Sequence, residues 1–224
     1  MSTQIPAYIG IIFILTTLTT IFLFFRAANN SVPTLIVILS WLVLHSILSL
    51  NGYYTVTDGT PPRFALLGVP TLLLMAILFI SKRGRRYIDS LDVKRLTYLQ
   101  TIRIPVEIVL FYLFISGYVP QLMTFEGRNF DILSGITAPL IAYYAFRKAL
   151  PNKPLLLVWN LICLGLLINV VLIAIFSAPF PFQKFAFDHP NVAVLYFPFT
   201  WLPCCVVPLV LFSHLASIRQ SIKR

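Results

Sequence analysis

The sequence predicts an all-helical, single-domain membrane protein, with one bundle of seven transmembrane helices over residues 1–224. Of the 224 residues, 58% are apolar and only 11% are charged, whereas a soluble domain has about a quarter of its residues charged. The apolar residues form continuous runs close to the roughly 20 residues that a membrane-spanning helix needs. These runs do not alternate every second residue, which favours helices over a β-barrel. The composition therefore excludes a soluble globular protein.

Seven apolar runs are separated by segments that contain Gly, Pro and charged residues. The predicted spans are residues 5–25, 33–50, 64–81, 96–115, 131–146, 154–177 and 192–217. The fifth span is the shortest and contains Gly135 and Pro139, so its ends are the least well defined. The sixth contains Asn160 and Asn169, and an amide inside a span usually indicates a hydrogen bond between helices.

The seventh span carries Pro198, Pro203 and Pro208 at a five-residue period. Each proline leaves one helical carbonyl without its donor and bends the chain. Membrane helices tolerate such breaks where neighbouring groups satisfy the carbonyl. We therefore expect a broken helix here. The broken helix could line a cavity, or it could serve helix packing alone.

Lysine and arginine predict the orientation. With seven spans, one side of the membrane receives thirteen basic residues and the other receives three. The thirteen are Arg26, Lys82, Arg83, Arg85, Arg86, Lys94, Arg95, Arg147, Lys148, Lys153, Arg219, Lys223 and Arg224, and the three are Arg63, Arg128 and Lys184. Positive residues concentrate in cytoplasmic loops, so the N-terminus is predicted outside and the C-terminus in the cytoplasm. The net charge of +10 then reflects topology and attraction to anionic lipid headgroups at the loop 82–95, rather than nucleic-acid binding.

Polar residues in the fourth span form the main candidate site. Gln100, Arg103 and Glu107 lie at positions i, i+3 and i+7, which places them on one helical face. A charge at this depth costs several kcal/mol unless it is paired or hydrated. Arg103 and Glu107 are placed to pair with each other, and Pro105 between them frees a backbone carbonyl. These residues could form a ligand or proton site, or Arg103 and Glu107 could form a structural ion pair.

The three histidines are predicted at different depths and therefore indicate no metal site. We also expect no cofactor. His45 and His214 are separated by more than about 10 Å along the membrane normal, whereas zinc ligands all lie about 2 Å from one ion. His45 could join Glu107 in one polar cavity, or it could serve packing alone. The cysteines all fall inside spans, so no disulfide framework is predicted.

The predicted outer loop 117–131 carries a dense group of polar residues. Asp131 or Asn129 is expected to cap the fifth helix. Together with Asp131, Glu126 and Arg128 are candidates for a lid over an outward-facing cavity.

Three functions fit these patterns. The first is binding or transport of a small or lipid-like molecule through a polar cavity lined by Gln100, Arg103, Glu107 and His45. The second is an intramembrane enzyme with Glu107 or His45 as acid–base, but no nucleophile–base pair is visible at usable spacing. The third is a helper subunit that docks another membrane protein. The patterns leave the ligand and the oligomeric state open.

Two stretches carry a resemblance to known proteins. RIPVEIVLFYLF (103–114) and MTFEGRNFDILSG (123–135) resemble an uncharacterised group of small bacterial seven-helix membrane proteins, which implies a bacterial inner membrane and no known activity. The seven-span layout with its N-terminus outside is similar to that of rhodopsins, although the seventh span has no lysine to attach retinal. Pro120–Gln121 resembles the dipeptide of PQ-loop transporters, in a single copy.

Overall fold

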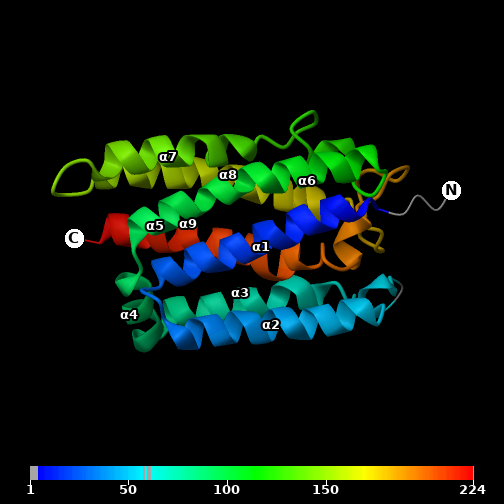
Figure 1. The fold of residues 1–224 in the computed structure, drawn as a ribbon, viewed down its shortest axis with the longest axis horizontal. Coiled ribbons are helices and arrows are strands. Elements are labelled where there is room, and N and C mark those ends of the chain that lie inside the picture. Colours follow the sequence, from blue (N-terminus) through cyan, green and yellow to red (C-terminus); the bar gives the residue numbers. More distant parts are fainter. Residues whose placement is uncertain (1–4, 58, 60–61, 224) are drawn as a thin grey trace.

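The computed structural model describes residues 5–57, 59 and 62–223, and within these ranges every regular element is helical (Figure 1). Arg224, one of the thirteen basic residues above, lies outside them. The helices are α1 Ala7–Ala27, α2 Val32–Leu50, α3 Ala65–Ile80, α4 Lys82–Ser90, α5 Val93–Leu99, α6 Arg103–Ile115, α7 Ile132–Phe146, α8 Lys153–Phe176 and α9 Val207–Ile222. Short helical turns are η1 Tyr53–Thr55, η2 Gln100–Ile102, η3 Gln121–Met123, η4 Ala193–Leu195 and the π-helical η5 Leu202–Val206.

Five segments of the described chain are long and apolar enough to cross a membrane. They are α1, α2, α8, the continuous stretch Val93–Ile115 that contains α5 and α6, and the stretch Leu202–Ile222 that contains α9. A sixth is counted if α3 and α4 form one span, although the chain bends by 95° between them. The remaining apolar helix, α7, has 15 residues. The structure thus supports a helical membrane protein with five or six spans, and seven remains a prediction.

The helices lie side by side along one long axis (Figure 1). The centre of the bundle contains α1 and α9, with α2 and α3 on one side and α7 and α8 on the other. The α9 helix packs against α8 and α5, and α1 packs against α5, α6 and α2. Aromatic rings fill the core beside α1. Phe13 contacts Phe199, which precedes η5, and Phe24 contacts Phe212 of α9. Large apolar side chains remain exposed on the perimeter, among them Ile77 of α3 and Leu140 of α7, as a membrane protein requires.

The last predicted span begins later than the sequence indicated. A helix from residue 192 was expected, but regular helical structure continuous with α9 begins only at Leu202. Residues before it form η4 and a series of turns. Two prolines, Pro198 and Pro203, explain the shift because neither can donate the backbone hydrogen bond that a regular helix needs.

The predicted break in this span is present as η5. In a regular α-helix the backbone N–H of residue 208 would donate to the Cys204 carbonyl, but Pro208 has no N–H. Instead, the Cys204 carbonyl accepts a hydrogen bond from Trp41 Nε1 in α2, at 3.0 Å. The break therefore ties α2 to the centre of the bundle.

At the C-terminal end of α3 the chain turns sharply into α4. Ser81 is the N-cap of α4, and its hydroxyl accepts a hydrogen bond from the Gly84 backbone N–H at 3.0 Å. Asp89 of α4 accepts hydrogen bonds from Arg219 at 2.9 and 3.1 Å and from Lys223 at 2.8 Å. These contacts fix α4 across the end of the bundle, beside the last turn of α9.

Candidate functional site

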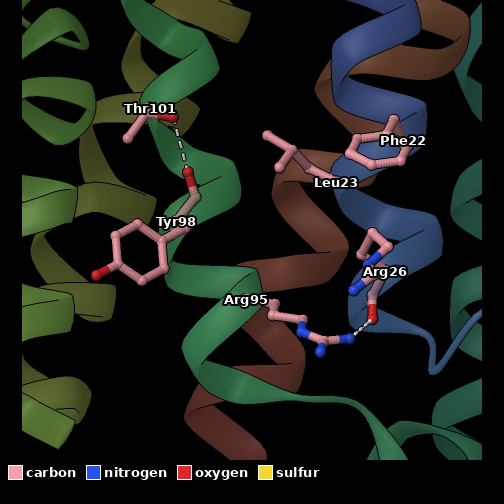
Figure 2. A pocket seen from close by; sticks show the side chains of 6 residues that line it. All are labelled: Phe22, Leu23, Arg26, Arg95, Tyr98 and Thr101. Atoms are coloured by element: carbon pink, nitrogen blue, oxygen red, sulfur yellow. Dashed lines mark hydrogen bonds between the residues drawn. The ribbon is translucent and has the colours of Figure 1, made fainter.

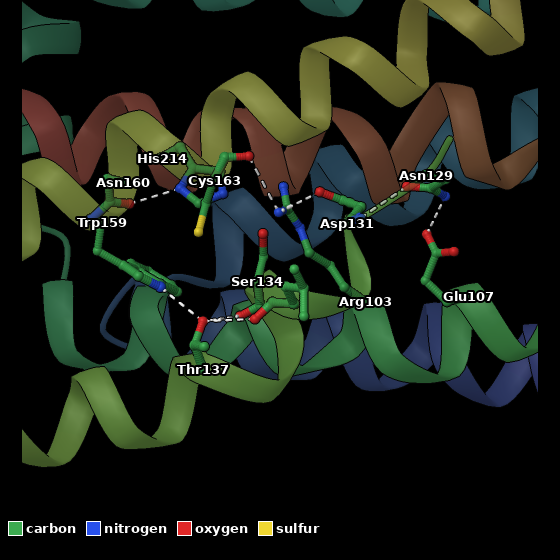
Figure 3. Close-up of polar contacts among 11 residues, drawn as sticks. Arg103, Glu107, Asn129, Asp131, Ser134, Thr137, Trp159, Asn160, Cys163 and His214 are labelled. Carbon is green, nitrogen blue, oxygen red and sulfur yellow. Dashed lines mark hydrogen bonds and ion pairs between the residues drawn. The ribbon is translucent and has the colours of Figure 1, made fainter. Parts of the chain in front are cut away.

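A buried ion pair lies where α6 begins. Arg103, its first residue, is 2% exposed, and its Nη1 donates a hydrogen bond to Asp131 Oδ1 at 2.7 Å. The same Nη1 lies 3.4 Å from the carbonyl oxygen of Cys163 in α8. The guanidinium therefore links α6 to the start of α7 and to α8 (Figure 3).

Glu107 lies one turn further along α6 and has a partner from the same segment before α7. Asn129 Nδ2 donates to Glu107 Oε1 at 2.6 Å and to the Met123 carbonyl at 2.9 Å. The Asn129 Oδ1 atom accepts from the backbone N–H of Asp131 at 3.0 Å. Asn129 is fully buried and Glu107 is 1% exposed. Residues 129–131 thus bind both charged side chains of α6.

A glycine explains why this segment reaches α6. A Cβ atom added at Gly135 in α7 would lie 2.9 Å from Ile104 Cγ1 and 3.1 Å from the Ile104 backbone N. Two helices can approach this closely where one of them has a glycine at the contact. Asp131 lies one helical turn before Gly135, so the close approach of α7 to α6 brings its carboxylate to Arg103.

The predicted pair between Arg103 and Glu107 is replaced by two separate contacts, one with Asp131 and one with Asn129. The third residue of the predicted face, Gln100, is 1% exposed and lies in η2. All three predicted side chains are therefore buried on one side of the Val93–Ile115 span.

Several polar atoms of this cluster have no hydrogen-bond partner among the described residues. They are Arg103 Nε and Nη2, Glu107 Oε2 and Gln100 Oε1, whereas the Ser134 hydroxyl interacts with the Cys163 thiol. A buried polar group without a partner costs roughly 1–3 kcal/mol, and more if it is charged. So many in one place distinguish this cluster from a fully satisfied structural network.

A second group of polar side chains continues the cluster along α8 and α9. His214 Nδ1 and Asn160 Oδ1 are 2.7 Å apart, and Trp159 Nε1 donates to Thr137 Oγ1 at 2.9 Å. Figure 3 shows these residues in line with the Arg103 group. The expectation that the amide of Asn160 binds another helix is confirmed.

His45 lies apart from this cluster. Its Nδ1 is 2.5 Å from the hydroxyl of Tyr54, and the Trp41 ring lies edge-on with its centroid 4.2 Å away. Among the described residues, no hydrogen bond joins it to Gln100, Arg103 or Glu107. The structure therefore places His45 in a separate contact between α2 and η1.

The three predicted lid residues have different environments. Glu126 and Arg128 are exposed and form no ion pair among the described residues, whereas Asp131 is 5% exposed and bound to Arg103. Asp131 stands at the N-cap position of α7, but its side chain makes no capping bond. Asp131 thus belongs to the buried cluster.

Sequence reasoning did not identify the partners of the charged residues. The sequence predicts Asn129 and Asp131 only as capping candidates. His214 was considered only as a metal ligand. Its contact with Asn160 could have been anticipated from two polar residues at similar depth in neighbouring spans. Within the described part of the chain, no three His, Cys, Asp or Glu side chains are grouped so that they could hold a metal ion.

Comparison with known proteins gives a family but no activity. Residues 62–221 match the model of a domain of unknown function, DUF8737. No curated protein and no solved structure matches the chain, and no likeness to rhodopsins or PQ-loop transporters is shown. The matched region runs from before α3 to the last turn of α9 and includes the whole Arg103–Glu107 cluster. Because it covers more than half of the sequence, the chain belongs to the DUF8737 family.

Proposed function

We propose that this protein spans a cell membrane seven times, with its N-terminus outside, and binds or moves a small polar or lipid-like molecule at the Arg103–Glu107 cluster. The observation that carries the proposal is the group of buried polar atoms, on Arg103, Glu107 and Gln100, that have no hydrogen-bond partner among the described residues. In a bilayer such atoms are costly, and intramembrane charges commonly mark substrate or ion pathways.

The chemistry of the cluster favours a ligand with both donor and acceptor groups. Arg103 offers two N–H-bearing nitrogens, Nε and Nη2, for which the described part of the chain supplies no acceptor, and Glu107 Oε2 and Gln100 Oε1 offer acceptors. The neighbouring Ser134 hydroxyl can do either. A carboxylate or phosphate group would pair with the free guanidinium nitrogens, while a hydroxyl or amine would donate to Glu107.

Mass spectrometry of gently purified protein tests this proposal. Wild type is compared with Glu107→Gln, which keeps the shape of the side chain, and with Glu126→Gln as an exposed control. We expect a retained small molecule or lipid in wild type and in the Glu126→Gln control, and its loss in Glu107→Gln. Identical spectra from all three folded samples would contradict the proposal.

The second candidate is a helper subunit of a membrane complex. The observation in its favour is that Arg103 and Glu107 each have a partner within the chain, Asp131 and Asn129. A structural network of this kind fixes helix packing without a ligand. In that case all three samples would show no ligand, and a partner protein would co-purify.

A further inference from the structure

A groove of about 680 Å³ lies between α1 and the stretch formed by α5 and η2, at the end of the bundle that contains α4. It is lined by Phe22, Leu23, Arg26, Arg95, Tyr98 and Thr101. Figure 2 shows that Leu23 extends from α1 toward the gap, while the two arginines lie together at its end. The groove is therefore apolar along its length and cationic at one end.

The arginines are held close together by a backbone contact. Arg95 Nη1 donates a hydrogen bond to the carbonyl oxygen of Arg26, which links α5 to the last turn of α1. The carboxylate of Asp92 lies 3.2 Å from Arg95 Nε and offsets one of the two charges. The Arg26 guanidinium is exposed and has no hydrogen bond or ion pair among the described residues. One positive charge at this end of the groove is thus unpaired.

We propose that this groove binds an anionic phospholipid, with its phosphate between Arg26 and Arg95 and an acyl chain along Phe22 and Leu23. Guanidinium groups bind phosphate oxygens through paired N–H donors, and basic pockets between transmembrane helices on the cytoplasmic side bind anionic headgroups. Tyr98, 37% exposed, also lines this groove. This site is distinct from the Arg103–Glu107 cluster.

A thermal-unfolding assay in detergent tests the assignment. Wild-type protein is titrated with short-chain phosphatidylglycerol, with phosphatidylcholine of the same chain length, and with inorganic phosphate. A ligand that binds only the folded state raises Tm. We expect phosphatidylglycerol to raise Tm by about 4 °C more than phosphatidylcholine does, and inorganic phosphate to have little effect.

The variants separate a site from diffuse attraction. Arg26→Gln removes the unpaired charge and leaves the backbone carbonyl that Arg95 uses, so folding is preserved. We expect it to lose at least half of the difference between the two lipids. Arg83→Gln, an exposed arginine of α4, removes the same charge elsewhere and is expected to keep the full difference. The proposal is overturned if Arg26→Gln behaves as wild type, if both variants lose the effect equally, or if inorganic phosphate reproduces it.

Discussion

The buried ion pair between Arg103 and Asp131 gives the sharpest test of the structure. Asp131→Asn removes the negative charge and leaves the Arg103 guanidinium 2% exposed with no carboxylate. Breaking one side of a buried ion pair costs about 3–5 kcal/mol. For a chain of this length, each kcal/mol lowers Tm by about 2–4 °C. We therefore expect Tm to fall by about 6 to 20 °C.

A double-mutant cycle separates the pair from its surroundings. Arg103→Met alone leaves Asp131 unpaired, and the double variant leaves neither charge. We expect the double variant to be more stable than the sum of the single losses predicts, by at least about 2 kcal/mol. The measurement is thermal unfolding in one detergent, followed by tryptophan fluorescence, with Glu126→Gln as a control. If Asp131→Asn has the same Tm as that control, the reasoning is refuted, because the stability of the buried Arg103 would not depend on this carboxylate.

Two further predictions concern the ends and the packing of the bundle. The hydrogen bonds from Arg219 and Lys223 lower the pKa of Asp89, so its stabilising effect is present above the unfolded value of about 3.9 and is lost as pH falls through the lower folded value. Asp89→Asn is expected to cost about 1 kcal/mol at neutral pH and to flatten the dependence of Tm on pH below about 4; an unchanged acid profile would contradict the assignment. Gly135→Ala is expected to cost about 1–3 kcal/mol through overpacking, whereas Gly165→Ala, whose Cβ meets no atom within 4 Å, is expected to cost nothing; equal melting curves would show that α7 can move aside.

The helical class and the buried face of the fourth span could be predicted because both follow from local chemistry. Apolar runs of this length have few alternatives, and charges within them cannot face lipid. The partners of those charges could not be predicted in the same way. Sequence spacing favoured a contact between Arg103 and Glu107, whereas Arg103 pairs with Asp131, 28 positions away. That choice depends on how α7 meets α6, which no local pattern encodes.

The start of the last span shows a different limit of prediction from sequence. Apolar composition continues through residues 192–201, so hydropathy alone extended the span to them. The structure forms turns there because the prolines cannot complete a helical ladder. His45 shows the same limit for the residues predicted to line the cavity with Glu107. Its depth suggested a shared cavity with Glu107, but its partner Tyr54 lies only nine positions away, in a turn that hydropathy does not define.

The short helix α7 has a consequence for the surrounding lipid. Its 15 residues extend about 22 Å, whereas the hydrocarbon layer is about 30 Å thick. The irregular segment before it, which carries the exposed Glu126 and Arg128, would have to occupy the remaining thickness if α7 crosses the membrane. A bilayer meets such a hydrophobic mismatch by thinning locally. Thinning on this flank would draw headgroups and water inward, on the side of the bundle where Asp131 precedes α7.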